Sequence, residues 1–262
     1  MKLKGKIIVI TGASSGVGEQ LAIQAAKLGG IPVLLARTEE RLQTLQCKLE
    51  KEYRTSCYSY KVDVTKEEQV QDVFDRIAKE VGYIDVLVNN AGFGKFLSFE
   101  DASLDEVKAM FDVNVFGVVA CIKAVLPAMV ERNNGHIINI ASMAGKIATP
   151  KSSAYAATKH AVIGLSNSLR MELAATNIKV TVVNPGPIHT NFFKIADRSG
   201  QYVESVQGIL LKPEYVAAET LKTTWKYKRE LQLPRWMGIG PVAFALFPRT
   251  FEVIAGAALR KK

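Results

Sequence analysis

The amino-acid sequence predicts a single α/β domain built on a doubly wound parallel sheet flanked by helices. Short β-branched runs alternate with longer amphipathic stretches along most of the 262 residues, which is the order that a parallel sheet with helical crossovers requires. The strand candidates are continuous apolar runs, such as Ile-Ile-Val-Ile at residues 7–10, as expected of strands buried on both faces. No repeat or low-complexity linker divides the chain, so we expect one domain, residues 1–262.

The expected elements follow one another in a regular order. Strands are predicted at residues 6–11, 31–36, 56–62, 84–89, 135–141 and 178–184. The helices between them are predicted at residues 16–29, 39–53, 66–81, 103–132 and 153–176. Right-handed β-α-β crossovers in this order give a Rossmann-like sheet.

Beyond residue 184 the alternation fades. Residues 190–212 mix Phe and Gly with polar residues, as a mobile loop or short helices over a site would. A helix is predicted at 213–228, with Pro213 suited to its first turn, and a last strand at 229–233.

Composition excludes several classes of protein. The net charge of +9 is spread along the chain without a long basic run, so nucleic-acid binding is not expected. Three irregularly spaced cysteines suit neither a disulfide framework nor a zinc site. No apolar segment with a small-residue cleavage site follows the N-terminus, and we expect a cytoplasmic protein.

Residues 236–262 form an apolar, basic-ended C-terminal extension. Glycine, proline and charged residues interrupt it, so it makes a poor transmembrane span, which needs about 20 consecutive apolar residues. Three roles stay open: a lid, a dimer contact, or a peripheral contact with a membrane surface, whose anionic lipids attract the basic end.

A glycine-rich turn follows the first strand and opens the first helix. Its spacing is Gly-x3-Gly-x-Gly, and its candidate cofactor-binding residues are Gly12, Ser14, Ser15, Gly16, Val17 and Gly18. Glycines let the backbone approach a pyrophosphate, whose charge is favoured by the free N–H groups of the helix N-terminus. The turn alone could be a plain strand-to-helix connection, but its place in an N-terminal β-α-β unit favours dinucleotide binding.

The second strand ends at Ala36 and is followed at once by Arg37. Sites for NAD usually place an acidic side chain here to bond the adenosine ribose. A carboxylate would repel a 2′-phosphate, whereas a guanidinium makes charge-assisted bonds to it. The alternative is a solvated loop arginine. We favour the phosphate role, so the predicted cofactor is NADP(H) rather than NAD(H).

Polar and small residues follow the third and fourth strands. Asp63 and Val64 come after the third strand, and Asn90, Ala91 and Gly92 come after the fourth. Ligands of open α/β sheets bind at the carboxyl ends of strands, so we expect Asp63 near the adenine and Asn90 and Gly92 near the ribose and the sheet edge. Turn chemistry also explains Asn and Gly, and both interpretations can hold together.

Tyr155 and Lys159 are the candidate catalytic pair. Their i,i+4 spacing puts them on one face of the predicted helix. A free tyrosine has a pKa near 10. A neighbouring ammonium, together with the positive nicotinamide of an oxidised cofactor, would lower that pKa toward the working range of an acid–base catalyst. Such a pair alone is usually structural. Ser142, at the end of the fifth strand, and Asn114, a polar residue amid Val and Phe, strengthen the catalytic interpretation.

These motifs together resemble the short-chain dehydrogenase/reductase family over roughly residues 5–235. The matching features, in order, are the glycine turn at 12–18, residues 89–92, Asn114, Ser142, Tyr155-x3-Lys159 and residues 185–190 (Pro-Gly-Pro-Ile-His-Thr). Arg37 resembles the NADP-preferring branch.

The resemblance implies a role for each catalytic candidate. Tyr155 would protonate the carbonyl oxygen or deprotonate the alcohol, and Lys159 would bond the nicotinamide ribose and depress the tyrosine pKa. Ser142 would polarise the substrate oxygen, and Asn114 would hold a water that relays protons from Lys159. The nicotinamide would be packed and bonded by Pro185, Gly186, Ile188 and Thr190.

The predicted function is hydride transfer between NADP(H) and a carbonyl or secondary alcohol, by a homodimer or homotetramer acting on a small molecule. Two alternatives are a non-catalytic Rossmann protein that senses dinucleotide and a membrane-associated reductase of lipid or steroid type. A sensor would not need a proton donor. Met143, Ile188 and Phe192 flank motif positions and are expected to line the substrate pocket. The three histidines lack metal-ligand spacing, so no metal is predicted.

Overall fold

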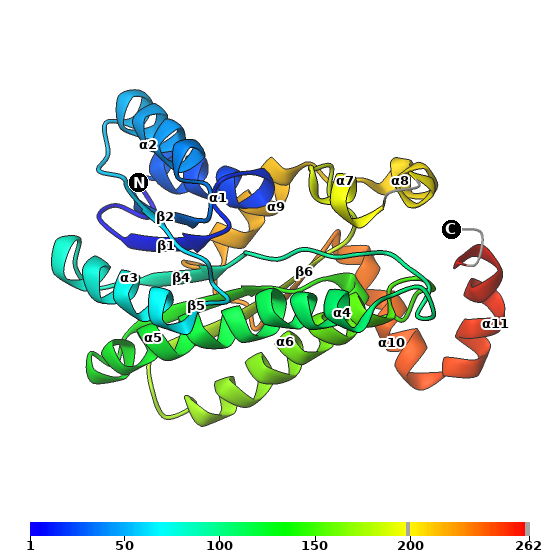
Figure 1. The fold of residues 1–262 in the computed structure, drawn as a ribbon. Helices are drawn as coiled ribbons and strands as arrows, with labels where there is room; N and C mark the ends of the chain where they lie inside the picture. The colour runs from blue at the N-terminus through cyan, green and yellow to red at the C-terminus, as the bar shows by residue number, and fades with distance from the viewer. Residues whose placement is uncertain (198–199, 260–262) are drawn as a thin grey trace.

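The protein is built around one seven-stranded, all-parallel sheet with helices on both faces (Figure 1). The computed structural model describes residues 1–197 and 200–259. The strands lie in the order β3-β2-β1-β4-β5-β6-β7, so the chain reverses direction across the sheet between β1 and β4. The predicted doubly wound sheet is confirmed, and the carboxyl ends of β1 and β4 meet at its switch point.

The strands lie where the apolar runs predicted them. They are β1 (Ile7–Thr11), β2 (Ile31–Ala36), β3 (Tyr58–Lys61), β4 (Val86–Asn89), β5 (Gly135–Ile140), β6 (Ile178–Pro185) and β7 (Glu230–Leu233). The main helices are α1 (Gly16–Lys27), α2 (Glu39–Tyr53), α3 (Glu67–Glu80), α4 (Leu104–Phe111), α5 (Gly117–Glu131), α6 (Ser153–Glu172) and α9 (Pro213–Lys222).

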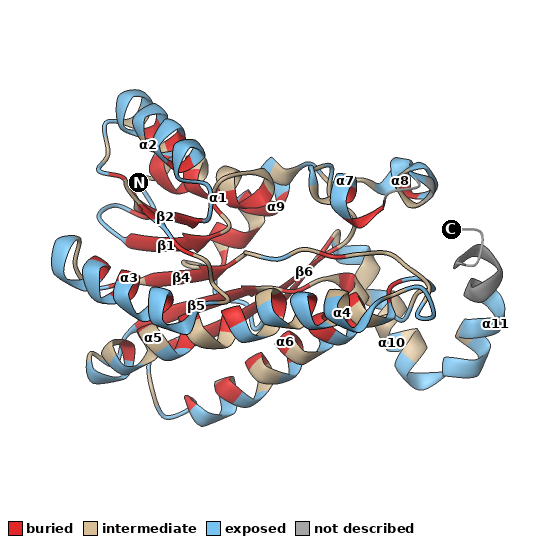
Figure 2. Cartoon of the chain, in the orientation of Figure 1, coloured by how far each residue is buried: buried red, intermediate tan, exposed pale blue. Residues whose placement is uncertain are grey.

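Successive strand residues face opposite sides of the sheet and so belong to two cores. Ile8 and Ile10 of β1 pack with α1, α2 and α9, whereas Ile7 and Val9 pack with α3, α5 and α6. Both sides of the sheet are buried (Figure 2), as a parallel sheet requires. This packing holds the strand ends, and the residues that follow them, in fixed positions.

Two predicted helices differ from expectation. The helix expected at 103–132 contains a π-helical turn, Asp112–Phe116, between α4 and α5. The helix expected at 213–228 ends at Lys222, because the hydroxyls of Thr223 and Thr224 donate to the carbonyls of Thr220 and Leu221 at its C-terminus and so satisfy orphan acceptors there.

The segment after β6 holds short helices, α7 (Phe192–Ala196) and α8 (Gln201–Val206), with a 3-10 turn at Gln207–Ile209. The C-terminal extension forms a 3-10 turn, Arg235–Gly238, then α10 (Ile239–Leu246) and α11 (Pro248–Leu259), which extend away from the sheet (Figure 1).

By length and composition, one helix of the described residues, Leu104–Glu131, could cross a membrane. This is weak evidence, since core helices pass the same test, and this helix packs on the sheet and against α3 and α6.

Candidate active site

A cavity of about 1430 Å³ opens at the carboxyl ends of the strands. A pocket for one drug-sized ligand occupies roughly 300–1,000 Å³, so this cavity has room for a dinucleotide and a second molecule. Every residue predicted from the sequence to bind cofactor or substrate, or to act in catalysis, lines it, except Gly18 and Asn114. The fold therefore brings residues that are up to 180 positions apart in the sequence to one cavity.

The glycine turn between β1 and α1 adopts a backbone that requires glycine. Gly12 and Gly16 have φ of +65° and +59°, in the left-handed region that disfavours side chains. Gly18 lies beneath the turn rather than in the cavity, where a Cβ would overlap the carbonyl oxygen of Gly12. The turn therefore brings its backbone, and the start of α1, to the cavity wall in the way a pyrophosphate would need.

Asn90 holds this turn in place. Its side-chain amide donates to the carbonyls of Thr11 and Gly12 at 3.0 and 3.3 Å, and its backbone N–H donates to the Thr11 hydroxyl at 2.9 Å. The hydroxyl also accepts from the N–H of Ala91. Thr11 was not predicted from the sequence. Asn90 was expected near the ribose and the sheet edge; its amide joins the ends of β1 and β4, and the residue also lines the cavity.

Two arginines lie at the far end of the cavity, where β2 runs into α2. Arg37 is exposed as well as cavity-lining, and so is Arg41, one helical turn later. Neither forms an ion pair with another residue of the described ranges. Arg41 was not among the residues predicted from the sequence, although its i+4 spacing from Arg37 was a usable signal. Two unpaired guanidinium groups suit an anionic group such as a 2′-phosphate.

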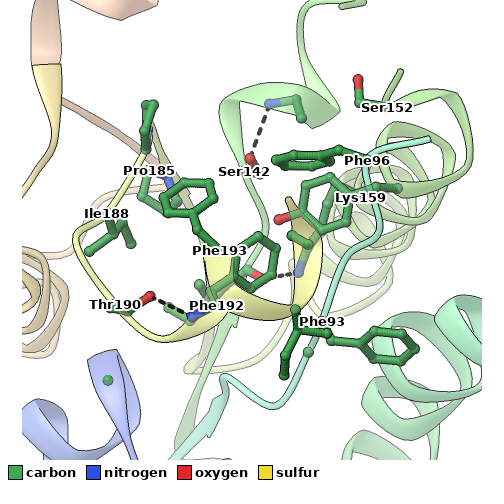
Figure 3. Close-up of a pocket in the computed structure, with 18 of the residues that line it drawn as sticks. Phe93, Phe96, Ser142, Ser152, Lys159, Pro185, Ile188, Thr190, Phe192 and Phe193 are labelled. Atoms are coloured by element: carbon green, nitrogen blue, oxygen red, sulfur yellow. Dashed lines mark hydrogen bonds between the residues drawn. The ribbon is translucent and has the colours of Figure 1, made fainter. Parts of the chain in front are cut away.

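Tyr155 and Lys159 of α6 line the cavity together with Ser142, which follows β5 and is hydrogen-bonded to Tyr155; Lys159 and Ser142 are labelled in Figure 3. Tyr155 is 8% exposed and Lys159 is 5% exposed. The Lys159 ammonium donates to the carbonyl of Ile140 at 3.0 Å and lies 5.7 Å from the centre of the Tyr155 ring. The Ser142 hydroxyl accepts from the N–H of Ala144 at 3.1 Å, which fixes its position at the end of the strand.

Burial governs the protonation of this pair. Desolvation raises the pKa of Tyr155 above its ordinary value, and the hydrogen bond with Ser142 opposes it. Desolvation also lowers the pKa of Lys159 to about 8. In the chain by itself, burial therefore opposes a lowered tyrosine pKa; the predicted depression relied on Lys159 together with the positive nicotinamide of an oxidised cofactor. A phenolate here would need further positive charge.

Asn114 lies in the π-helical turn and is completely buried. Its amide donates to the carbonyl of Phe93 at 2.8 Å and to the hydroxyl of Thr158 at 3.1 Å, and its oxygen accepts from the N–H of Phe93 at 3.0 Å. A Cβ on Gly92 would lie 3.0 Å from this oxygen and 3.5 Å from the Lys159 nitrogen. Asn114 therefore joins the segment after β4 to α6, beside Lys159. Such π-helical turns are common at functional sites.

Aromatic rings close over Tyr155. Phe96 and Phe192 lie with their ring centres 5.9 and 5.7 Å from that of Tyr155 (Figure 3), and Tyr202 packs on Phe96 at 4.6 Å. A Cβ on Gly94 would lie 2.9 Å from both Phe192 and Tyr155, so only glycine fits there. The candidate pocket residues Met143 and Ile188 also line the cavity. Tyr202 and Gly94 were not among the residues predicted from the sequence, because no spacing rule connects them to Tyr155.

The segment after β6 joins the two ends of the cavity. Its backbone is held where Gly186 donates to the carbonyl of Leu233 at 2.7 Å and where Ile188 pairs with Leu211. Thr190 is placed next to the glycine turn, since a Cβ on Gly16 would lie 3.3 Å from its methyl group. Pro185 lines the cavity beside them (Figure 3).

Metal ligation finds no support in the ranges that the structure describes, where no group of three or more His, Cys, Asp or Glu residues could hold an ion. His136 is buried and bonded to Thr181, and burial lowers its pKa to about 3. It packs against Tyr227 rather than facing the cavity.

Known proteins resemble this chain in sequence and in structure. A family model described as short chain dehydrogenase matches residues 6–199. A dehydrogenase/reductase SDR family member 7B of Xenopus laevis is 36% identical over 275 residues, covering 99% of this chain and 84% of that protein. The solved structure of a serine dehydrogenase complexed with NADP+ is 32% identical, with a TM-score of 0.80 over 86% of this chain and 93% of that chain. A short-chain dehydrogenase/reductase of Burkholderia phymatum in complex with NAD is 25% identical, with a TM-score of 0.83 over 98% and 96%.

Proposed function

We propose that this chain, which belongs to the short-chain dehydrogenase family, transfers a hydride between NADP(H) and the carbonyl or secondary alcohol of a small molecule, with Tyr155 as the acid–base group. The observation that carries the proposal is the position of Tyr155, Ser142 and Lys159 in the same cavity as the glycine turn. A nicotinamide bound there would supply or accept the hydride. The enzyme is taken to be a cytoplasmic homodimer or homotetramer.

Each catalytic candidate has a task that its geometry supports. Tyr155 holds a proton at its hydroxyl, because burial raises its pKa, and passes it to the carbonyl oxygen during reduction. Ser142 orients and polarises that oxygen. Lys159 adds positive charge beside the ring and bonds the ribose of the cofactor. Asn114 connects the segment after β4 to α6 beside Lys159 and holds the water of the proton relay.

A non-catalytic sensor fits less well. A buried lysine beside a buried tyrosine costs stability, since both groups lose water. Dinucleotide binding alone would not need a tyrosine hydrogen-bonded to Ser142 in the same cavity. A screen of carbonyls and alcohols for NADPH consumption or formation tests the choice. The proposal fails if a protein that binds the cofactor turns over none of them.

We expect NADPH to bind more tightly than NADH. Arg37→Ala should lower the ratio of the two affinities by about tenfold, corresponding to about 1.4 kcal/mol. The reason is loss of a charge-assisted bond to the 2′-phosphate, which NADH lacks. Titration of each dinucleotide by quenching of tryptophan fluorescence measures both affinities. Equal affinities of the parent protein for the two cofactors would contradict the assignment to NADP(H).

Arg41 should contribute to the same preference. We expect Arg41→Gln to weaken binding of adenosine 2′,5′-bisphosphate by about fivefold, or about 1 kcal/mol, and to leave binding of adenosine 5′-monophosphate unchanged. Calorimetry measures both. The matched control is Lys48→Gln, which removes an exposed positive charge from the same helix, α2, but outside the cavity. If Lys48→Gln weakened binding of the bisphosphate equally, the effect of Arg41 would be a long-range electrostatic one and not a contact with the 2′-phosphate.

A further inference from the structure

Helix α10 is apolar on the side that faces away from the protein. Residues 236–248 include no charged residue. Ile239, Val242 and Leu246, at i, i+3 and i+7, lie on one helix face and are 73%, 58% and 65% exposed. Much of the tail is coloured as exposed or intermediate (Figure 2). A helix that is apolar all round is normally buried, so this face lacks a partner.

The same surface continues into the next helix. Phe247 between the helices and Val253 and Ile254 of α11 are also exposed. Together with the α10 face they give the tail six large exposed apolar side chains, and the main contacts of the tail's described elements are with one another and with β7. Apolar exposure on this scale marks an interaction site rather than ordinary surface.

The inner side of the tail is part of the substrate cavity. Met237 and Phe251 line it, and a Cβ on Gly240 would lie 2.9 Å from Ile147 of the segment after β5, which also lines the cavity. Trp236 and Ile239 both line the cavity and reach solvent, so they form part of its rim. Ile195 of α7 also lines the cavity and is exposed. Exposed apolar side chains, two of them in the tail, thus border the cavity.

Charge distinguishes between the partners that such a surface could take. Residues 235–262 carry five basic residues and one acidic residue; Arg235 lies 3.6 Å from Glu219, and residues 260–262 lie outside the described residues. Because a twofold dimer brings two copies of the same segment together, the surplus of positive charge in its sequence opposes association. An anionic lipid surface complements it, and a tryptophan at the rim suits the interface between headgroups and acyl chains.

We propose that α10 and α11 seat the mouth of the cavity on an anionic lipid bilayer, and that the substrate is an apolar carbonyl or alcohol that enters from the bilayer. The substrate part rests on the proposed hydride transfer, whereas the docking part does not. The apolar face supplies burial in the headgroup region, and the basic residues supply attraction to anionic lipid.

Flotation with vesicles tests the docking. We expect the parent protein to float with vesicles of phosphatidylcholine containing 30% phosphatidylglycerol, much less with phosphatidylcholine alone, and less again at 0.5 M salt. Val242→Glu/Leu246→Glu, which changes two exposed residues outside the cavity, should lower the bound fraction more than tenfold. Met171→Glu/Val130→Glu adds the same charge at exposed sites on α6 and α5 and should float as the parent does. Circular dichroism melts check that all three proteins fold.

Two outcomes overturn the docking. One is a tail variant that floats as well as the parent. The other is a parent protein that floats with neither vesicle, while Val242→Glu/Leu246→Glu lowers its apparent mass on size-exclusion chromatography. That result would make the surface a contact between copies of this chain.

A second assay tests the substrate. With NADPH, the parent should reduce a long-chain alkyl aldehyde in anionic vesicles at least fivefold faster than the tail variant, and both should reduce a short water-soluble aldehyde equally. Equal rates on the long-chain substrate refute entry from the bilayer, while absence of any reduction by a protein that floats refutes the hydride transfer alone.

Discussion

Tyr155→Phe is expected to lower turnover about 10³-fold and to leave NADP(H) binding unchanged. Positioned acid–base groups contribute roughly 10²–10⁴-fold to rate, and this substitution removes only the hydroxyl that carries the proton. The ring stays, so its contacts with Phe96 and Phe192 keep the site in shape. Turnover is measured with the best carbonyl from the screen, and cofactor binding by fluorescence titration.

The matched control for this prediction is Tyr60→Phe. It removes a hydroxyl from another buried ring, which bonds Glu80 far from the cavity, and turnover should stay within about twofold, or about 0.4 kcal/mol. Turnover retained in Tyr155→Phe would mean that another group donates the proton. Loss of cofactor binding in the same variant would mean that the hydroxyl positions the dinucleotide instead.

Lys159→Met is expected to abolish measurable turnover and, near pH 7, to stabilise the fold. Lys159 is buried, and desolvation lowers its pKa to about 8 from the ordinary 10.5. That difference corresponds to about 3 kcal/mol of cost to the charged form in the folded state. Methionine has a similar length and carries no charge, so the substitution removes the cost together with the function.

The pH dependence of folding stability tests the lowered pKa of Lys159. Between pH 8 and 10.5 the unfolded chain keeps the Lys159 proton more tightly than the folded chain does, so stability rises with pH in this window. Urea unfolding at pH 7.5 and 9.5 should therefore show a gain in the parent that Lys159→Met lacks. Lys48→Met, at an exposed site of α2, should show the same gain as the parent. A parent that is less stable at pH 9.5 would contradict the depressed pKa.

The order of the strands and the helices around the site could be predicted from local sequence. β1 and β6 are recognised by their apolar runs, since burial on both faces favours apolar residues. Tyr155 and Lys159 were paired because α6 is a regular helix, in which i and i+4 share a face. Gly12 and Gly16 were found because their positive φ angles restrict the residue type.

Other features depend on atoms that are distant in sequence. Asn114, in the π-helical turn at Asp112–Phe116, makes three hydrogen bonds to Phe93 and Thr158. The helical periodicity of the sequence does not indicate these bonds. Gly94 is restricted by the rings of Phe192 and Tyr155, which are about 60 and 100 residues away. Desolvation, which raises the tyrosine pKa, also depends on the whole of the surrounding packing.

The sequence by itself determined the family, the parallel sheet and the candidate residues at the carboxyl ends of its strands, because each of these follows from local periodicity or from residue type at fixed spacing. Only the tertiary structure decided that Arg41 joins Arg37 at the cavity, that Phe96 and Phe192 close over Tyr155, and that the apolar tail forms part of the rim of the cavity. The physical reason is that these contacts arise between elements, where packing of the two cores sets the distances and no local pattern records them.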